Sequence, residues 1–263
     1  MILKEKIHSL LLGEAKNYRL TVENEVASTN TVLKEQAKSG LRENSILIAN
    51  SQTAGRGRMG RSFFSPGNTG IYMSILFFRD IPVTDAVFIT TSAAVAAAKA
   101  IEKIGRKKAE IKWVNDIYTD GKKVCGILTE AQSNVKTGKL DFAVLGIGVN
   151  VFMPENEFPA EIREIASSVM DCGSDENIMN LLAAEILNNV CEYISDIKSR
   201  EYIEEYKSRS MLTGREVYVI KGDIKTSAKA IGIDDEARLM VEYESGERET
   251  LSFGEVSVKK VAQ

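Results

Sequence analysis

Hydrophobic and polar positions alternate along the chain with two periods, one typical of helices and one typical of strands. Helical spacing predicts helices over residues 2–11, 29–38, 85–104 and 176–198, with a further turn or two that ends at Tyr206. Apolar runs bounded by turn residues predict strands over residues 19–22, 45–50, 71–78, 110–114, 124–131 and 140–149. Helices that alternate with strands in this way indicate an α/β main domain.

The pattern changes near Thr213 and Gly214. Beyond them the chain predicts short strands only, over residues 216–220, 227–233, 239–243 and 249–253. The sequence therefore predicts a main domain over residues 1–212 and a small SH3-like β-barrel over residues 213–263. No flexible linker marks the boundary, so we expect the barrel to dock on the main domain.

The composition narrows the classes of function. The 263 residues are 44% hydrophobic, which is enough for a sizeable core, and they carry a net charge of −3. His8 is the only histidine, and the three cysteines show no C-x-x-C spacing, which argues against histidine catalysis and a His or Cys metal cluster. No apolar run approaches eighteen residues, so we expect a soluble, cytoplasmic protein without membrane contact.

A loop between two predicted strands reads Gly-Arg-Gly-Arg-Met-Gly-Arg over residues 55–61. Its glycines have the spacing G-x-G-x-x-G, but a dinucleotide-binding fingerprint opens a helix, whereas here a Phe-Phe-Ser-Pro-Gly turn and a strand follow. Residues 45–79 contain no Asp or Glu, so the loop is a cationic island in an acidic chain. Arginine binds phosphate and carboxylate with paired donors. The loop is therefore either an anion-binding lid or a solvated surface loop.

A second segment, Lys-Trp-Val-Asn-Asp at residues 112–116, places one lysine among residues typical of a buried strand. Lys112 either extends to solvent or holds a buried anion. Asn115 and Asp116 predict a turn in which side chains bond local backbone, and Asp116 could instead help to bind a metal. Trp113 is expected to be a packing residue.

Two further features predict close approach of chain segments or of a ligand. Residues 146–150, Gly-Ile-Gly-Val-Asn, end a predicted strand with alternate glycines, which lets another chain or a ligand approach the backbone closely. The pair Phe63 and Phe64 fits the core and a ligand wall equally well.

Together these motifs resemble those of the biotin protein ligases, also called biotin–[acetyl-CoA-carboxylase] ligases. The resemblance runs from about residue 25 to the end of the chain and rests on motifs at residues 28–30, 52, 55–61, 64–66, 112–116, 126–128 and 146–150. It implies an α/β fold, similar to the class II synthetases, in which helices flank a mixed sheet and a small C-terminal SH3-like β-barrel follows. Two departures are visible, because the family usually has proline where Val114 stands and often tryptophan where Phe63 stands.

The resemblance implies a ligase that activates biotin with Mg²⁺-ATP as biotinyl-5′-AMP and transfers it to a lysine of a biotin carboxyl carrier protein. Lys112 and Arg58 would then be catalytic, with Lys112 between the biotin carboxylate and the α-phosphate. The implied substrate-binding residues are Ser28, Thr29, Asn30, Gln52, Gly55, Arg56, Gly57, Arg58, Lys112, Gly126, Ile127 and Asn150. No side-chain cluster indicates a metal site, and Asp116 is the one candidate ligand for Mg²⁺.

Alternatives to this interpretation remain open. A lipoate–protein ligase would share the architecture and the chemistry, and a non-catalytic biotin or nucleotide sensor would share the pocket. Some twenty-five residues precede the Ser28-Thr29-Asn30 segment, which is short for the DNA-binding domain of one family branch. We therefore expect no nucleic-acid partner, and a monomer or a homodimer are both compatible with the sequence.

Overall fold

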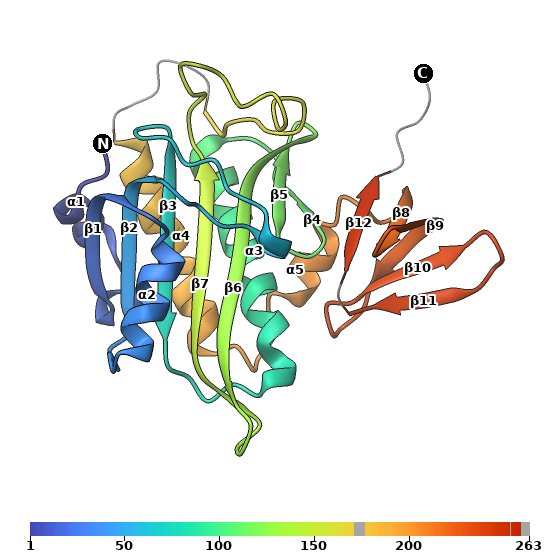
Figure 1. The fold of residues 1–263 in the computed structure, drawn as a ribbon, viewed down its shortest axis with the longest axis horizontal. Coiled ribbons are helices and arrows are strands. Elements are labelled where there is room, and N and C mark those ends of the chain that lie inside the picture. The colour runs from blue at the N-terminus through green and yellow to red at the C-terminus, as the bar shows by residue number, and fades with distance from the viewer. Residues whose placement is uncertain (171–176, 253, 259–263) are drawn as a thin grey trace.

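The computed structural model describes residues 1–170, 177–252 and 254–258, and its main domain is built on a seven-stranded sheet (Figure 1). The strand order is β1-β2-β3-β7-β6-β5-β4. Only β1 and β2 are parallel, and every other neighbouring pair is antiparallel, so the sheet is mixed. The strands are β1 (Arg19–Val26), β2 (Ser45–Gln52), β3 (Gly70–Phe77), β4 (Glu110–Lys112), β5 (Asp116–Thr119), β6 (Lys122–Asn134) and β7 (Lys139–Asn150).

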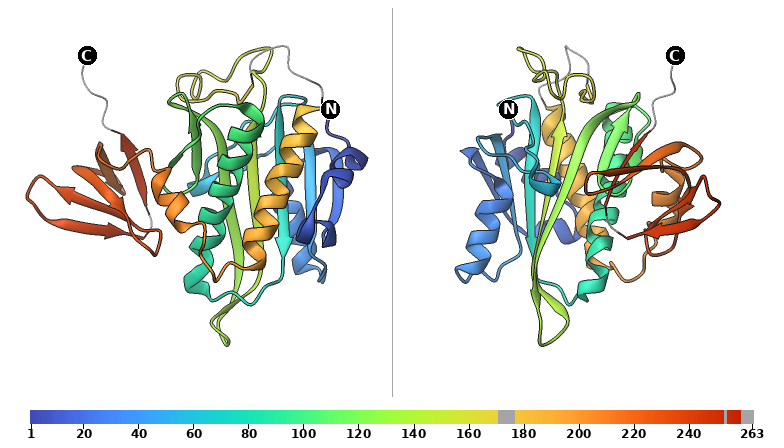
Figure 2. Two further views of the ribbon diagram at one scale, coloured as in Figure 1. Left: turned by 180° about the vertical axis from the view of Figure 1, so that it is seen from behind. Right: turned by 45° about the vertical axis from the view of Figure 1, so that its right-hand side comes forward.

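Helices cover the two faces of this sheet unequally. Helices α3 and α4 pack side by side on one face, and α2 lies alone on the other face against β2, β3 and β7 (Figures 1 and 2). The α-helices are α1 (Lys4–Leu10), α2 (Thr29–Lys38), α3 (Ala86–Gly105), α4 (Ile178–Ser195) and α5 (Ile203–Ser208). Short 3₁₀ turns occur at η1 (Gly13–Asn17), η2 (Arg58–Gly60) and η3 (Val83–Asp85). Because one short helix covers its face only in part, that face has room for a ligand.

Helix α3 is the central helix of the core. Its alanines present a small, flat surface, and most of them are fully buried against the sheet and α4. Within the described residues, 83–105 form the one helical segment long and apolar enough to cross a membrane by length and composition. Its most apolar 18-residue window is 72% buried inside the protein, as expected for the core helix of a globular domain.

The C-terminal unit is a separate antiparallel sheet of five strands in the order β11-β10-β9-β8-β12. The strands are β8 (Glu216–Lys221), β9 (Ile224–Ile233), β10 (Leu239–Tyr243), β11 (Arg248–Leu251) and β12 (Glu255–Val258). The predicted docking on the main domain is confirmed, because the Trp113 indole Nε1 donates to the backbone oxygen of Ala237 at 2.9 Å. Trp113 is 5% exposed, so its predicted packing role is confirmed at this boundary.

Most predicted elements agree with the structure to within a few residues, and the differences are local. The predicted turn at Asn115 is present, but Asp116 already begins β5, which pairs with β4 and β6. Strand β12 was not predicted. The expected helix start at residue 176, the expected strand end at residue 253 and Cys172 lie outside the described residues.

Candidate active site

A cavity of about 360 Å³ opens on the α2 face of the sheet, a size typical of small-molecule sites. The start of α2, the arginine loop, β6, β7 and the C-terminal sheet contribute to its wall. The wall includes nearly all residues that the sequence singled out, namely Ser28, Thr29, Asn30, Gln52, Arg56, Gly57, Arg58, Lys112, Gly126, Ile127 and Asn150. Ile127 contributes here while its side chain belongs to the main core.

Gly55 is the predicted binding residue that stands outside the described cavity wall. A Cβ at this position would lie 2.4 Å from the Phe63 backbone oxygen and 2.7 Å from Ser65 Oγ. The Gly55 backbone oxygen accepts from the Phe63 N–H at 2.9 Å. Gly55 is therefore required for the loop to fold back closely on itself, and its contribution to the site is indirect.

The arginine loop is an internally bonded turn. Its two arms meet at a bridge between Arg56 and Ser62, and the Gly57 N–H donates to the Arg61 backbone oxygen at 2.7 Å. Met59 and Gly60 have φ values of 56° and 75°, which close the turn in the left-handed region. The Met59 side chain is 71% exposed. The loop thus lays its arginines across the cavity mouth.

Each arginine of the loop has its own partner. Arg56 Nη1 lies 3.1 Å from both carboxylate oxygens of Glu130, and Arg61 Nη2 lies 2.5 Å from Oε1 of Glu255. Arg58 Nη1 donates to Asn115 Oδ1 at 2.9 Å. Glu130 and Glu255 therefore compensate the repulsion among the three arginines within the protein itself.

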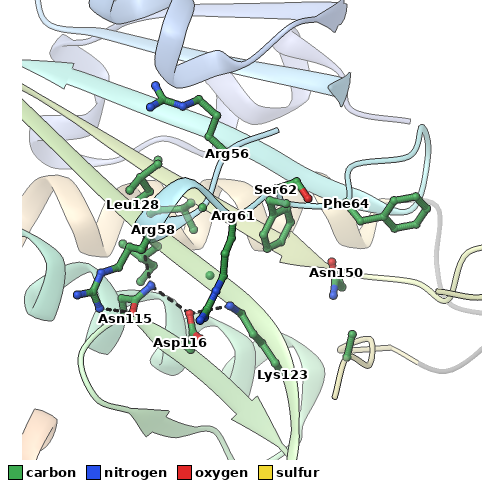
Figure 3. Close-up of a pocket in the computed structure, with 18 of the residues that line it drawn as sticks. Arg56, Arg58, Arg61, Ser62, Phe64, Asn115, Asp116, Lys123, Leu128 and Asn150 are labelled. Atoms are coloured by element: carbon green, nitrogen blue, oxygen red, sulfur yellow. Dashed lines mark hydrogen bonds and ion pairs between the residues drawn. The ribbon is translucent and has the colours of Figure 1, made fainter. Parts of the chain in front are cut away.

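A hydrogen-bonded chain of polar side chains crosses one wall of the cavity (Figure 3). Asn115 accepts from Arg58 and donates through Nδ2 to Asp116 Oδ1 at 3.0 Å. Asp116 in turn pairs with Lys123 Nζ at 2.7 Å. Asn115 Nδ2 also donates to the Ile127 backbone oxygen at 2.8 Å, so the predicted turn is bonded to strand β6 rather than only to its own backbone.

Lys112 is half-buried at the end of β4 and lines the cavity. Its Nζ lies 5.9 Å from the centre of the Tyr118 ring. Burial lowers the pKa of Lys112, and the neighbouring cations Lys123 and Arg61 lower it too, against the opposing effect of Asp116 and Glu255. Among the residues that the structure describes, no carboxylate lies within ion-pair distance of Lys112. The second of the two sequence alternatives, a lysine that holds an anion, fits this position better than one that extends to solvent.

Another part of the cavity wall carries neutral polar groups. Gln52 Oε1 accepts from the Thr29 backbone N–H at 2.9 Å, and Gln52 Nε2 donates to Ser65 Oγ at 2.9 Å. The buried Ser74 hydroxyl donates to Asn30 Oδ1 at 2.6 Å and lies 2.7 Å from Thr29 Oγ1. These bonds fix the Thr29 and Asn30 side chains in a pocket suited to a neutral, hydrogen-bonding head group.

The alternate glycines of β7 make room for side chains that shape this pocket. A Cβ at Gly146 would lie 2.2 Å from Asn30 Oδ1, and a Cβ at Gly148 would lie 2.6 Å from Phe63 Cε1. The close approach predicted from these glycines is confirmed. Phe63 itself lies over Gly126 and Gly148 and lines the cavity, so it belongs to the wall as well as to the packing.

A third part of the cavity is apolar. Phe64 and Phe158 meet edge to face with their ring centroids 6.3 Å apart, and both line the cavity beside Ile162 and Ile165. Asn150 reaches this region from the end of β7 and donates to the Ser167 backbone oxygen at 3.1 Å. A flat aromatic group would fit such a slot.

Besides the apolar residues Phe158, Ile162 and Ile165, the sequence-based prediction missed four residues that make polar contacts in the site, namely Ser74, Lys123, Glu130 and Glu255. Lys123 and Glu255 line the cavity, whereas Ser74 and Glu130 orient residues that do. Gly126, Leu128 and Glu130 occupy every second position of β6 and therefore share one face of the strand. Strand periodicity could thus have placed Glu130 on the cavity face. Ser74 and Glu255 are brought to the site by contacts between distant elements, whereas Lys123 reaches Asp116 through the pairing of β6 with the neighbouring strand β5.

Comparisons with known proteins agree with this geometry. The model of the biotin/lipoate A/B protein ligase family matches residues 23–150, and that of the biotin protein ligase C-terminal domain matches residues 212–259. The biotin–[acetyl-CoA-carboxylase] ligase of Mycobacterium tuberculosis is 30% identical over 96% of this chain and 94% of its own length. This chain belongs to the biotin protein ligase family. The bifunctional ligase/repressor BirA of Bacillus subtilis is also 30% identical, over 90% of this chain and 73% of its own length.

Solved structures of biotin protein ligases share the fold. The biotin protein ligase from Aquifex aeolicus in complex with biotin and ATP superposes with a TM-score of 0.74 and 27% identity. The match covers 92% of this chain and 99% of that chain. The shared fold has a mixed sheet with its helices and a separate C-terminal antiparallel sheet. The prediction of an α/β main domain followed by a small C-terminal β unit is therefore confirmed.

Proposed function

We propose that this protein is a biotin–[acetyl-CoA-carboxylase] ligase that makes biotinyl-5′-AMP from biotin and ATP and passes the biotinyl group to a lysine of a biotin carboxyl carrier protein. The observation that carries the proposal is the layout of the cavity. One cavity wall combines a neutral polar pocket around Asn30, an apolar slot around Phe158 and a cationic centre formed by Lys112, Arg58 and Lys123.

In the first step, a carboxylate oxygen of biotin attacks the α-phosphorus of ATP, and pyrophosphate leaves. Two anions must meet, so the barrier depends on cations that are in place beforehand. Lys112 has this position, since it is half-buried and faces the cavity. Arg58, held by Asn115, adds a second cation from the loop. The head group of biotin would occupy the pocket of Thr29, Asn30 and Gln52, and adenine the apolar slot.

In the second step, the amine of the acceptor lysine attacks the acyl carbon and forms an amide. The bond between the acyl carbon and the phosphate oxygen breaks, AMP leaves with its electron pair, and the nitrogen loses a proton to solvent. The acyl-adenylate must be kept from water until the acceptor arrives. The arginine loop lies across the cavity mouth and is tied to β6, to the turn between β4 and β5 and to the C-terminal sheet by its partners. Opening and closing of this loop would control access.

Mg²⁺ would bind at this site only together with the nucleotide. Within the described part of the chain, no group of three or more His, Cys, Asp or Glu residues could hold a metal. Asp116 faces the cavity but is engaged by Lys123. Mg²⁺ usually keeps several waters and binds through phosphate and one or two carboxylates, so it would arrive with ATP. It would supply charge neutralisation on the phosphates.

The proposal also covers the domain boundary, the C-terminal fold, the cellular location, nucleic-acid binding and the oligomeric state. The boundary of the two units at residues 212 and 213 is supported by the start of β8 at Glu216. An SH3-like barrel for residues 213–263 is supported by five short antiparallel strands. A cytoplasmic location is supported by the free, buried thiols of Cys125 and Cys191. The acidic net charge supports a function without nucleic acid, and a monomer and a homodimer both remain compatible.

Release of pyrophosphate separates this function from its alternatives. A biotin ligase should release pyrophosphate when biotin and ATP are mixed with the protein, and lipoate should not replace biotin. A lipoate ligase would show the opposite preference. A non-catalytic sensor would bind one of the compounds in isothermal titration without releasing pyrophosphate.

A further inference from the structure

Glu130, near the middle of β6, is the meeting point of two parts of the site. One oxygen of its carboxylate accepts from Asn30 Nδ2 at 3.2 Å, and the other accepts from Lys34 Nζ at 2.7 Å. Arg56 Nη1 of the arginine loop lies 3.1 Å from both oxygens. A single carboxylate therefore contacts the ligand pocket, helix α2 and the loop.

The environment of Glu130 makes these contacts stronger than those of an ordinary surface pair. Its side chain is only 13% exposed, whereas Arg56 is 47% exposed. Burial alone would raise the pKa of Glu130, but hydrogen bonds from Lys34 and Asn30 and the charges of Lys34 and Arg56 together lower it. The carboxylate is thus ionised at neutral pH and accepts charge-assisted hydrogen bonds from Lys34 and Arg56.

The two contacts also define what Asn30 and Arg56 can do. The Asn30 amide donates to Glu130 and to the Leu128 backbone oxygen, and its Oδ1 accepts from Ser74. These bonds fix the orientation of the Asn30 amide in the cavity wall. Arg56 points away from the cluster of Arg58, Asn115 and Asp116, toward Glu130 (Figure 3). Its guanidinium anchors the loop, while those of Arg58 and Arg61 face the cationic centre.

We propose that Glu130 is a positioning residue of the ligase reaction that fastens the arginine loop, through Arg56, to the pocket residue Asn30 and so keeps the loop closed over the acyl-adenylate. This inference rests on the proposed function. It assigns Glu130 no contact with substrate, so its removal should leave the formation of the adenylate intact and should instead let the adenylate escape.

Pyrophosphate release without an acceptor protein measures both quantities at once. The wild-type protein should give a burst of one equivalent, followed by slow release that reports loss of the adenylate. Glu130→Gln should keep the burst, and Glu130→Gln and Arg56→Met should each speed the slow phase about fivefold, the effect of a partly exposed ion pair. The double variant should also be about fivefold faster, because both changes remove the same contact.

Lys34→Met is the matched control, since it removes a cation from Glu130 without touching the loop. Its slow phase should stay within about twofold of the wild type. The midpoint of thermal unfolding of each variant checks the fold, and Arg56→Met carries the test alone if Glu130→Gln unfolds.

A double variant that speeds the slow phase by about twenty-five fold, the product of two independent effects, would overturn the inference. An unchanged slow phase in both single variants would also overturn it. Failure of the proposed function is a different result, because the wild-type protein would then give no burst with biotin and ATP.

Discussion

Arg61 Nη2 donates to both carboxylate oxygens of Glu255, at 2.5 and 2.6 Å, although the two residues are 194 positions apart in the chain. Arg61 belongs to the loop of the main domain, and Glu255 begins the last described strand of the C-terminal sheet. Both residues line the cavity. The C-terminal unit therefore takes part in holding the loop, in addition to its contact with Trp113.

This pair predicts that the C-terminal sheet steadies the loop before any ligand binds. In Glu255→Gln, backbone N–H groups of residues 56–61 should exchange with solvent about three- to fivefold faster, because a partly exposed ion pair is lost. Hydrogen exchange followed by mass spectrometry measures this. Glu249→Gln, which breaks the exposed pair with Lys221 in the same sheet, is the control and should leave loop exchange unchanged. Equal exchange in all three proteins would show that the pair does not restrain the loop.

Acid should weaken the same contact. The hydrogen bond from Arg61 is the largest cause of a lowered pKa at Glu255, and hydrogen bonds from Lys34 and Asn30 help to lower that of Glu130. A lowered pKa in the folded state means that both carboxylates stabilise the fold above their ordinary pKa of 4.5, and that this contribution is lost as pH falls through the lowered values. Urea unfolding should give a constant free energy above about pH 5.5 and a declining one below pH 4.5. In Glu130→Gln the decline should be shallower, and an identical decline would contradict the assignment.

Lys112→Ala tests the cationic centre. The variant should keep the fold, because the lysine is only half-buried, but it should lose about 3 kcal/mol of transition-state stabilisation in adenylate formation, by analogy with removal of an oxyanion donor. The burst rate of pyrophosphate release would fall by about two orders of magnitude. Lys34→Met, which leaves the cavity intact, serves as control. A burst at nearly the wild-type rate would remove Lys112 from the chemistry.

Gly148→Ala tests the shape of the pocket. The added methyl would lie 2.6 Å from Phe63 Cε1, so the ring must move into the cavity or strain the loop. We expect biotin binding to weaken by about 1–3 kcal/mol in isothermal titration, the usual range for overpacking. Gly67→Ala is the control, because its nearest neighbour would lie at 3.8 Å and no strain arises. Unchanged affinity in Gly148→Ala would mean that Phe63 is not part of the binding wall.

The sequence was sufficient to predict long elements in which apolar residues recur at regular spacing. The strand at residues 45–50 and the alanine-rich helix ending near residue 104 agree with β2 and α3 because their apolar pattern is set by burial on one side or both. Strand β5 was taken for the end of a turn, since four residues that begin with Asp116 become a strand only by pairing with β4 and β6. Short segments of this kind depend on their neighbours rather than on their own composition.

The site was predictable where a motif carried its own chemistry. Arg58 and Lys112 were chosen through the resemblance to the biotin protein ligases, because the residues alone left a solvated loop and a lysine extending to solvent open. Glu255 was not chosen, because a lone carboxylate in a chain of 37 acidic residues has no local signature. Strand periodicity could place Glu130 on the cavity face, but it does not show which cation the carboxylate meets. Their importance depends on which cation faces them across the fold. Gly55 was assigned to binding from its place in the motif, whereas its contacts with Phe63 and Ser65 show a packing role.

The central claim is that one cavity both activates biotin and delivers it to a lysine of a carrier protein. Intact mass measurement of a biotin carboxyl carrier domain, incubated with this protein, biotin and ATP, tests it most directly. We predict addition of one biotinyl group that depends on ATP, does not occur with lipoate, and is lost in Lys112→Ala and when the acceptor lysine is replaced by arginine. An unmodified carrier domain in the presence of active, folded protein, or modification by lipoate in preference to biotin, would contradict the account.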